Sequence, residues 1–361
     1  MRFRLTTLLV FTILYAVPAV AAAQEFVPDT VTTSKARVTE IVSQDVKIVP
    51  GTDVETVYQT IKAEVLDGEE KGKNITIEND YLELREGQIF YVSHTTSSLH
   101  GTDYYAVSEV DRLPALFVLL VLFIAVVLFF GGKQGARGLL ALFGGFFLIA
   151  FLLLPGVLQG YSPILISVAV SSLIVCLGSY VTHGFNKTTT TAVLGMVITI
   201  VLTGLLAYVS IVFTQLSGFN TDETVYLNFN TRGSIDFAGL LLGGIIIGTL
   251  GVLYDAAIGQ AVSVEELARA GEHLSRREVY RRALRIGREH IGALVNTLAI
   301  AYVGASLPLL LLFYGFGSDS VALALNREVF ATELVRTLVG SIGLVLTVPI
   351  TTAISVRMLM R

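Results

Sequence analysis

The sequence contains little charge and almost no cysteine. Only 15% of its 361 residues are charged, whereas a soluble globular protein has about 25%, so the composition argues against an ordinary soluble enzyme. The single cysteine, Cys176, lies in an apolar segment, which excludes an intrachain disulfide and a cysteine-rich metal site. The HExxH, GxSxG and P-loop patterns are also absent from the sequence. We therefore expect no enzymatic activity, no metal and no cofactor.

Long apolar runs are the main feature that is present. Hydrophobic residues make up 53% of the chain, and its mean hydropathy is +0.71. A run of about 20 apolar residues spans the hydrocarbon core of a bilayer. The sequence therefore predicts an α-helical polytopic membrane bundle of about seven transmembrane helices. The predicted spans are 114–131, 138–158, 162–182, 190–214, 237–262, 291–313 and 333–356.

The first 23 residues have the pattern of a secretory signal. Arg2 and Arg4 precede an apolar stretch at 5–17, and alanines occupy 21–23. Cleavage after these alanines is one interpretation, and an uncleaved signal anchor is the other. Both place residues from 24 onward on the exported side of the membrane.

Residues 24–112 differ in character from the apolar part. Short runs of alternating polar and apolar residues are separated by turn residues such as those at 50–51 and 67–68, which predicts a small antiparallel β barrel or sandwich. Residues 24–113 carry 8 Lys and Arg against 17 Asp and Glu, so nucleic acid is not an expected partner. A recognition domain is favoured over a hydrolase assembled from His94 or His100 with nearby serines and acids.

Basic residues indicate the topology of the predicted bundle 114–361. If residue 24 is exported, twelve Lys and Arg lie in cytoplasmic segments and three in exported ones, in agreement with the positive-inside rule. The C-terminus is then cytoplasmic. The twelve are Lys133, Arg137, Lys187, Arg269, Arg276, Arg277, Arg281, Arg282, Arg285, Arg288, Arg357 and Arg361.

The cytoplasmic segment 263–290 is predicted to be amphipathic. Ser263 and Ser275 each precede a glutamate by three residues, the spacing of a capping box, so we expect a helix to begin at each. Arginines line one face of the second helix, which favours contact with the anionic inner leaflet. This segment is interpreted either as a topology anchor or as a regulatory element.

Asp255 is the acidic residue placed farthest from both interfaces in the predicted spans. An ionised carboxylate at the bilayer centre costs about 2.5–3.5 kcal/mol. Small residues share its helical face at spacings of three and four, and such a face allows a second helix to approach closely. We therefore expect Asp255 to point into the bundle, either as a proton or cation relay or as a hydrogen-bonded packing residue. The expected packing face consists of Gly244, Gly248, Gly251 and Gly259.

Two groups of polar residues are expected near this helix. Asn296 and Thr297 open the sixth span at a depth that matches Asp255, so we expect them to reach its carboxyl. Glu333 and Arg336 are three residues apart at the other interface and are predicted to form an ion pair.

Three segments resemble the YibE/F family of bacterial membrane proteins: 243–255, 296–308 and 333–343. The resemblance implies a multi-spanning membrane protein and no assigned activity. The pattern around Asp255, Asn296 and Thr297 is also similar to the proton-coupled half of SecD/SecF and other RND-type transporters.

These patterns support two hypotheses of function. The first is a proton- or cation-coupled transporter or permease, which carries a small-molecule or polypeptide cargo and acts with a paralogous subunit or as a homo-oligomer in the lipid bilayer. The second is a non-transporting membrane scaffold or assembly factor whose exported domain binds a partner.

Overall fold

The computed structural model describes residues 30–49, 51–98, 102–271, 273–316 and 320–360. The predicted signal at 1–23 lies outside these residues. The chain divides into two compact units with a boundary after Leu122, and each is described by itself.

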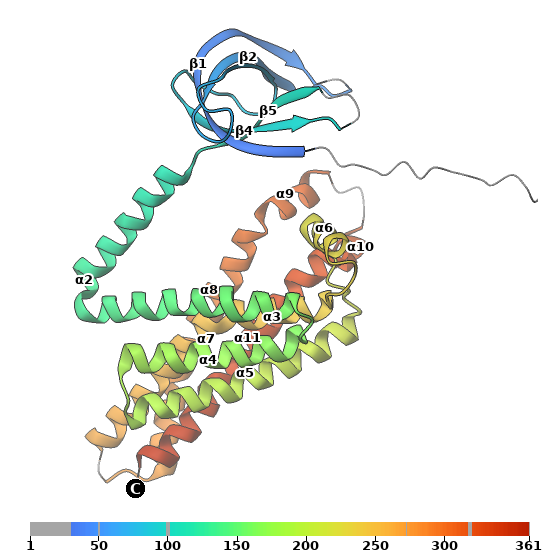
Figure 1. Ribbon diagram of the computed structural model, residues 1–361. Coiled ribbons are helices and arrows are strands. Elements are labelled where there is room, and N and C mark those ends of the chain that lie inside the picture. The colour runs from blue at the N-terminus through green and yellow to red at the C-terminus, as the bar shows by residue number, and fades with distance from the viewer. Residues whose placement is uncertain (1–29, 50, 99–101, 272, 317–319, 361) are drawn as a thin grey trace, which may run out of the picture. The chain divides into compact units, whose positions relative to one another are not determined.

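The first unit contains five strands in one antiparallel sheet of order β3-β2-β1-β4-β5 (Figure 1). The two edge strands, β3 and β5, contact each other, so the sheet curls into a half-barrel. This curvature agrees with the predicted antiparallel β domain. The strands are β1 Thr30–Ile48, β2 Glu55–Val65, β3 Asn74–Asn79, β4 Ile89–Thr96 and β5 Asp103–Val110.

Apolar residues at alternate positions of the strands form the core of this unit. Apolar side chains that point to one face, among them Ile61, Ile77 and Phe90, are almost completely buried, because successive side chains of a strand point to opposite faces. Gln59 is also buried, and its amide bonds both the carbonyl oxygen (2.9 Å) and the backbone nitrogen (2.8 Å) of Leu84. The segment after β3 is thereby held over the core.

The second unit consists of helices, and α2 connects it to the sheet. The elements are α2 Leu113–Leu148, the π-helix η1 Ile149–Leu153, α3 Leu154–Leu158, α4 Pro163–His183, α5 Lys187–Thr214, α6 Asp222–Asn230, α7 Phe237–Ala270, α8 Arg276–Ala305, α9 Leu307–Phe316, α10 Val321–Asn326 and α11 Glu328–Leu359.

The number of apolar helices differs from the seven expected. Five helical stretches of the described chain are long and apolar enough to span a membrane, or six if the bent pair α8 and α9 forms one span. The first two predicted spans fall within one continuous stretch, Leu113–Leu158, of 46 residues. This stretch is not straight, because Gly132 interrupts α2 with a positive φ of 52° (Figure 1).

The predicted span 291–313 is also broken. Helices α8 and α9 meet at an angle of 64°, and Pro308 lies at the start of α9. Proline removes a backbone donor and clashes with the preceding turn, which accounts for a break at this position.

The predicted helix start at Ser263 is wrong, whereas the one at Ser275 is confirmed. Helix α7 continues through Ser263, whose hydroxyl donates to the Gly259 carbonyl oxygen at 2.8 Å. No breaker precedes Ser263, and Val264 is completely buried, so packing extends the helix. Ser275 accepts a hydrogen bond from the Glu278 backbone nitrogen at 3.2 Å and caps α8.

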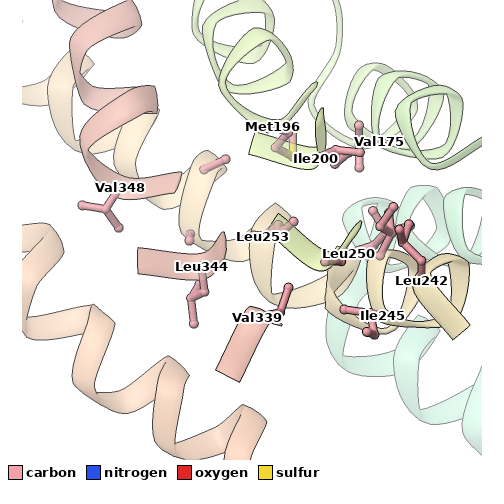
Figure 2. Packing of buried hydrophobic residues seen from close by; sticks show 14 of the residues in the cluster. Val175, Met196, Ile200, Leu242, Ile245, Leu250, Leu253, Val339, Leu344 and Val348 are labelled. Carbon is pink, nitrogen blue, oxygen red and sulfur yellow. The ribbon is translucent and has the colours of Figure 1, made fainter. Parts of the chain in front are cut away.

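Four long helices, α4, α5, α7 and α11, together with part of α8, surround the core of the bundle. Figure 2 shows apolar side chains from several helices meeting in it, including Ile200, Leu253 and Leu344. Glycines let the backbones approach closely. A side chain at Gly195 would collide with Thr351, and one at Gly343 would collide with Thr203. These are the small-residue interfaces typical of membrane helices.

Candidate functional site

The face of α7 that carries Asp255 is exposed in the described chain. Leu253, Ala256 and Ala257 of the same helix are buried, but Asp255 is exposed. Added β-carbons at Gly244, Gly251 and Gly259 would meet no atom within 4 Å, whereas one at Gly248 would lie 2.9 Å from the hydroxyl oxygen of Tyr302 on α8. The expected packing face therefore has a close helix approach at Gly248 and open space at its other three glycines.

The open part of this face has a physical reason. Spacings of three and four residues identify which residues share a helix face, but they do not determine what covers that face. The interior contacts of α7 use other glycines instead. Gly243 approaches Ser167 of α4, and Thr249 approaches Gly340 of α11.

The expected contact between Asp255 and the start of the sixth span is not present. Asn296 and Thr297 are exposed on α8. The Thr297 hydroxyl donates to the Ala293 carbonyl oxygen at 2.9 Å in its own helix. Among the described residues, the Asp255 carboxyl and the Asn296 amide have no hydrogen-bond partner.

A cavity of about 270 Å³ lies beside Asp255 between α7, α8 and α11. His290 lines the same cavity from α8. Gln260 lies at its wall, and the Gln260 amide donates to the Ala283 carbonyl oxygen at 2.7 Å. The sequence analysis did not identify His290 as a site residue. Its position at helical spacing from Val279 and Ala283, which are buried on the same face of α8, could have indicated it.

Glu333 and Arg336 form an ion pair on α11, with 3.0 Å between carboxylate and guanidinium. The guanidinium carbon lies 6.0 Å from the centre of the Tyr302 ring on α8. The hydroxyl of Tyr302, the Nε of Arg336 and the hydroxyl of Thr332 are buried without a hydrogen-bond partner among the described residues. The predicted pairing of Glu333 with Arg336 is therefore present, within a larger polar cluster that joins α8 and α11.

The half-barrel carries a third polar cluster, centred on His94 of β4. Its ring stacks on Tyr105 of β5, with centroids 4.6 Å apart. Glu70 Oε2 lies 3.5 Å from its Nδ1, and Asp103 Oδ1 lies 3.0 Å from its Nε2. Lys73 contacts Glu70 at 2.6 Å and the Tyr105 hydroxyl at 2.7 Å. The cluster links the β2–β3 turn to β4 and β5.

Hydrogen bonds lower the pKa of both carboxyls in this cluster. Lys73 is the main cause for Glu70, and Thr96 is the main cause for Asp103, followed by His94. Both shifts favour the ionised carboxylates.

The part of the chain that contains the helical clusters matches a protein family. The model of the YibE/F-like protein family matches residues 119–361, which is most of the chain and contains all of α2 except its first turns and every later helix. The chain belongs to the YibE/F-like protein family. No curated protein and no solved structure matches it significantly. The similarity of this YibE/F-like chain to SecD/SecF and RND-type transporters stays a prediction.

Proposed function

We propose that this YibE/F-like chain is a proton- or cation-coupled transporter or permease, with Asp255 as its intramembrane relay. The position of the Asp255 carboxyl supports the proposal: it belongs to the 34-residue apolar helix α7 and lines a cavity shared with α8 and α11. A carboxylate within the hydrocarbon region is costly, so such residues typically mark proton or ion pathways. Gain or loss of a proton there changes which helix arrangement is favoured.

The proposed topology retains seven spans in a bacterial cytoplasmic membrane. At 1.5 Å per residue, the 46-residue stretch Leu113–Leu158 is about 70 Å long, more than twice the core thickness of about 30 Å. We therefore assign one span to each side of Gly132. Residues 24–112 are then exported, and the C-terminus is cytoplasmic.

The proposal also assigns roles to the neighbouring polar groups. Asn296 and Thr297 are the side chains that a movement of α8 along α7 would bring to Asp255. The exposed glycine face of α7 leaves room for a helix of a second, paralogous or identical subunit. The Glu333–Arg336 pair is a secondary charged site.

A pH-jump experiment in proteoliposomes tests the proposal. Wild-type protein is reconstituted with an internal pH-sensitive dye, and the external pH is changed in the presence of an imposed cation gradient. We expect Asp255→Asn to abolish the protein-dependent proton flux, because the amide retains the shape but does not titrate. Asp222→Asn on α6 makes the same chemical change outside the long helices and serves as the control. Unchanged flux in Asp255→Asn would contradict the proposal.

One observation favours the alternative of a scaffold or assembly factor. The β1–β2 hairpin exposes large apolar side chains at Val42, Val46, Ile48 and Val54, and the exposed fraction of Val46 is 63%. Exposed apolar patches mark binding surfaces. Under this alternative, Val46→Lys with Ile48→Lys would abolish function while Asp255→Asn would leave it intact.

A further inference from the structure

The cavity beside α7 brings together two titratable groups that the sequence separates by 35 positions, Asp255 and His290. Within the described part of the chain, they are the only ionisable residues that line it. Helix α7 contributes Asp255, α8 contributes His290, and α11 contributes uncharged Val348. The other lining residues are uncharged as well: Ala256, Gly259, Gln260, Ala293 and Leu294.

Asp255 and His290 are both exposed on this cavity, and among the described residues no ion pair joins them. Most of the lining is apolar, and the Gln260 amide nitrogen is already engaged by the Ala283 carbonyl oxygen at 2.7 Å. A volume of about 270 Å³ holds several water molecules, each of which occupies about 30 Å³ in the liquid.

We propose that His290 is a second proton-carrying group of this cavity and exchanges protons with the Asp255 carboxyl. This inference rests on the proposed function and adds a residue to the relay. In the forward step a proton leaves an imidazolium nitrogen of His290 and bonds to a carboxylate oxygen of Asp255. The products are a neutral imidazole and a neutral carboxyl. The reverse step restores the two charges, and no other reactant is consumed.

Labelling with an apolar carbodiimide, which reacts with protonated carboxyls, tests the inference without a transport assay. The full chain in liposomes is labelled at about pH 5.5, and modification of the Asp255 peptide is measured by mass spectrometry. An imidazolium stabilises the nearby carboxylate, so wild-type labelling is slow. We expect His290→Gln to accelerate it at least about threefold.

Two further variants separate charge from structure. His290→Lys retains a positive charge and is expected to label at the wild-type rate. His183→Gln removes a histidine that lines a different cavity with Glu265 and should also leave the rate unchanged. Equal labelling of Asp255 in wild type and His290→Gln would overturn the inference, as would equal acceleration in His290→Gln and His290→Lys.

The outcomes distinguish this inference from the proposed function. If Asp255→Asn abolishes proton flux but His290→Gln leaves the labelling unchanged, His290 is excluded and the transporter proposal stands. If His290→Gln accelerates labelling but Asp255→Asn leaves the flux unchanged, the pair exists without proton-coupled transport.

Discussion

At the scale of single residues, glycine has two different uses in this bundle. Gly195 and Gly343 lie where α5 and α11 approach each other, and added β-carbons there would collide with threonines. Gly244 and Gly251 on α7 have open space around them. Sequence spacing predicted the second pair as part of a packing face and did not detect the first, because Gly195 and Gly343 each meet a threonine of another helix only after folding.

The matched variants Gly195→Ala and Gly244→Ala test this distinction. Gly195→Ala should reduce the free energy of unfolding by about 1–3 kcal/mol, because the methyl group overpacks the contact with Thr351. Gly244→Ala should be neutral or stabilise the protein by up to about 1 kcal/mol through helix propensity. Thermal unfolding of both variants in the same detergent provides the measurement. Equal destabilisation of the two would contradict the different packing of these glycines.

The carboxyls around His94 predict a pH dependence of the half-barrel. The ordinary pKa values of Glu70 and Asp103 are 4.5 and 3.8, and both are lowered in the fold. A lowered pKa means that the unfolded chain binds protons first as the pH falls. The stabilisation is therefore complete above the ordinary values and is lost as the pH falls through the lowered ones.

Hydrogen–deuterium exchange of β5, corrected for intrinsic rates, measures this loss between about pH 7 and about pH 3. We expect protection to fall with pH in the wild type and to depend less on pH in Glu70→Gln. The control is Glu55→Gln, which alters an exposed carboxylate outside the cluster. A Glu70→Gln profile parallel to that of the wild type would contradict the assignment.

At the scale of elements, α7, α8 and α11 pack together at one end of the bundle. Val279 and Ala283 of α8 are completely buried with Val264 of α7 and Val356 of α11. The apolar face of α8 opposite its arginines is therefore covered by protein. The amphipathic pattern predicted the arginine-lined face, but such a pattern does not distinguish lipid from a neighbouring helix as the cover of the apolar face.

Ala283→Leu tests what covers this face. A larger side chain in a packed interface should destabilise the protein by about 1–3 kcal/mol, whereas a helix that rests on lipid would tolerate leucine. Arg285→Ala, an exposed position on the same helix, should stay within about 0.5 kcal/mol of the wild type. The midpoint of thermal unfolding is the readout for both variants.

Long apolar helices and the β character of the polar part were the features most accessible to prediction. The predicted spans 162–182 and 190–214 nearly coincide with α4 and α5, because long apolar runs indicate membrane helices. The strands lie in 24–112 as predicted, because period-two alternation requires one buried and one exposed face. The predicted helix start at Ser263 failed because a capping pattern occurs by chance inside a helix that packing continues. Local signals therefore identified elements well and their boundaries less well.

At the scale of the whole molecule, composition separated a polar N-terminal part from an apolar helical part, and the structure has a half-barrel followed by helices. The candidate site was only partly predictable. The Glu333–Arg336 pair follows from local spacing, but the presence of Asp255 and His290 on one cavity requires two helices to be packed. Sequence periodicity contains no information about such pairings.

Cysteine labelling tests the assignment of two spans to Leu113–Leu158. Lys133→Cys, in a chain whose Cys176 is replaced by Ser, places a thiol one residue after the interruption at Gly132. A membrane-impermeant maleimide should label it from the cytoplasmic side only. Labelling from the exported side, or no labelling before detergent is added, would exclude the proposed topology. Phe129→Cys, four residues away within the apolar helix, should stay unlabelled and is the control.

The proposed relay on α7 is tested most sharply by comparing three side chains at position 255 in the proteoliposome assay. The initial rate of internal pH change is measured after an external pH jump for wild type, Asp255→Glu and Asp255→Asn at equal protein density. We expect glutamate, which titrates, to retain proton flux and asparagine to reduce it to the rate of protein-free liposomes. Equal rates for Asp255→Asn and the wild type would show that the carboxyl on α7 carries no protons.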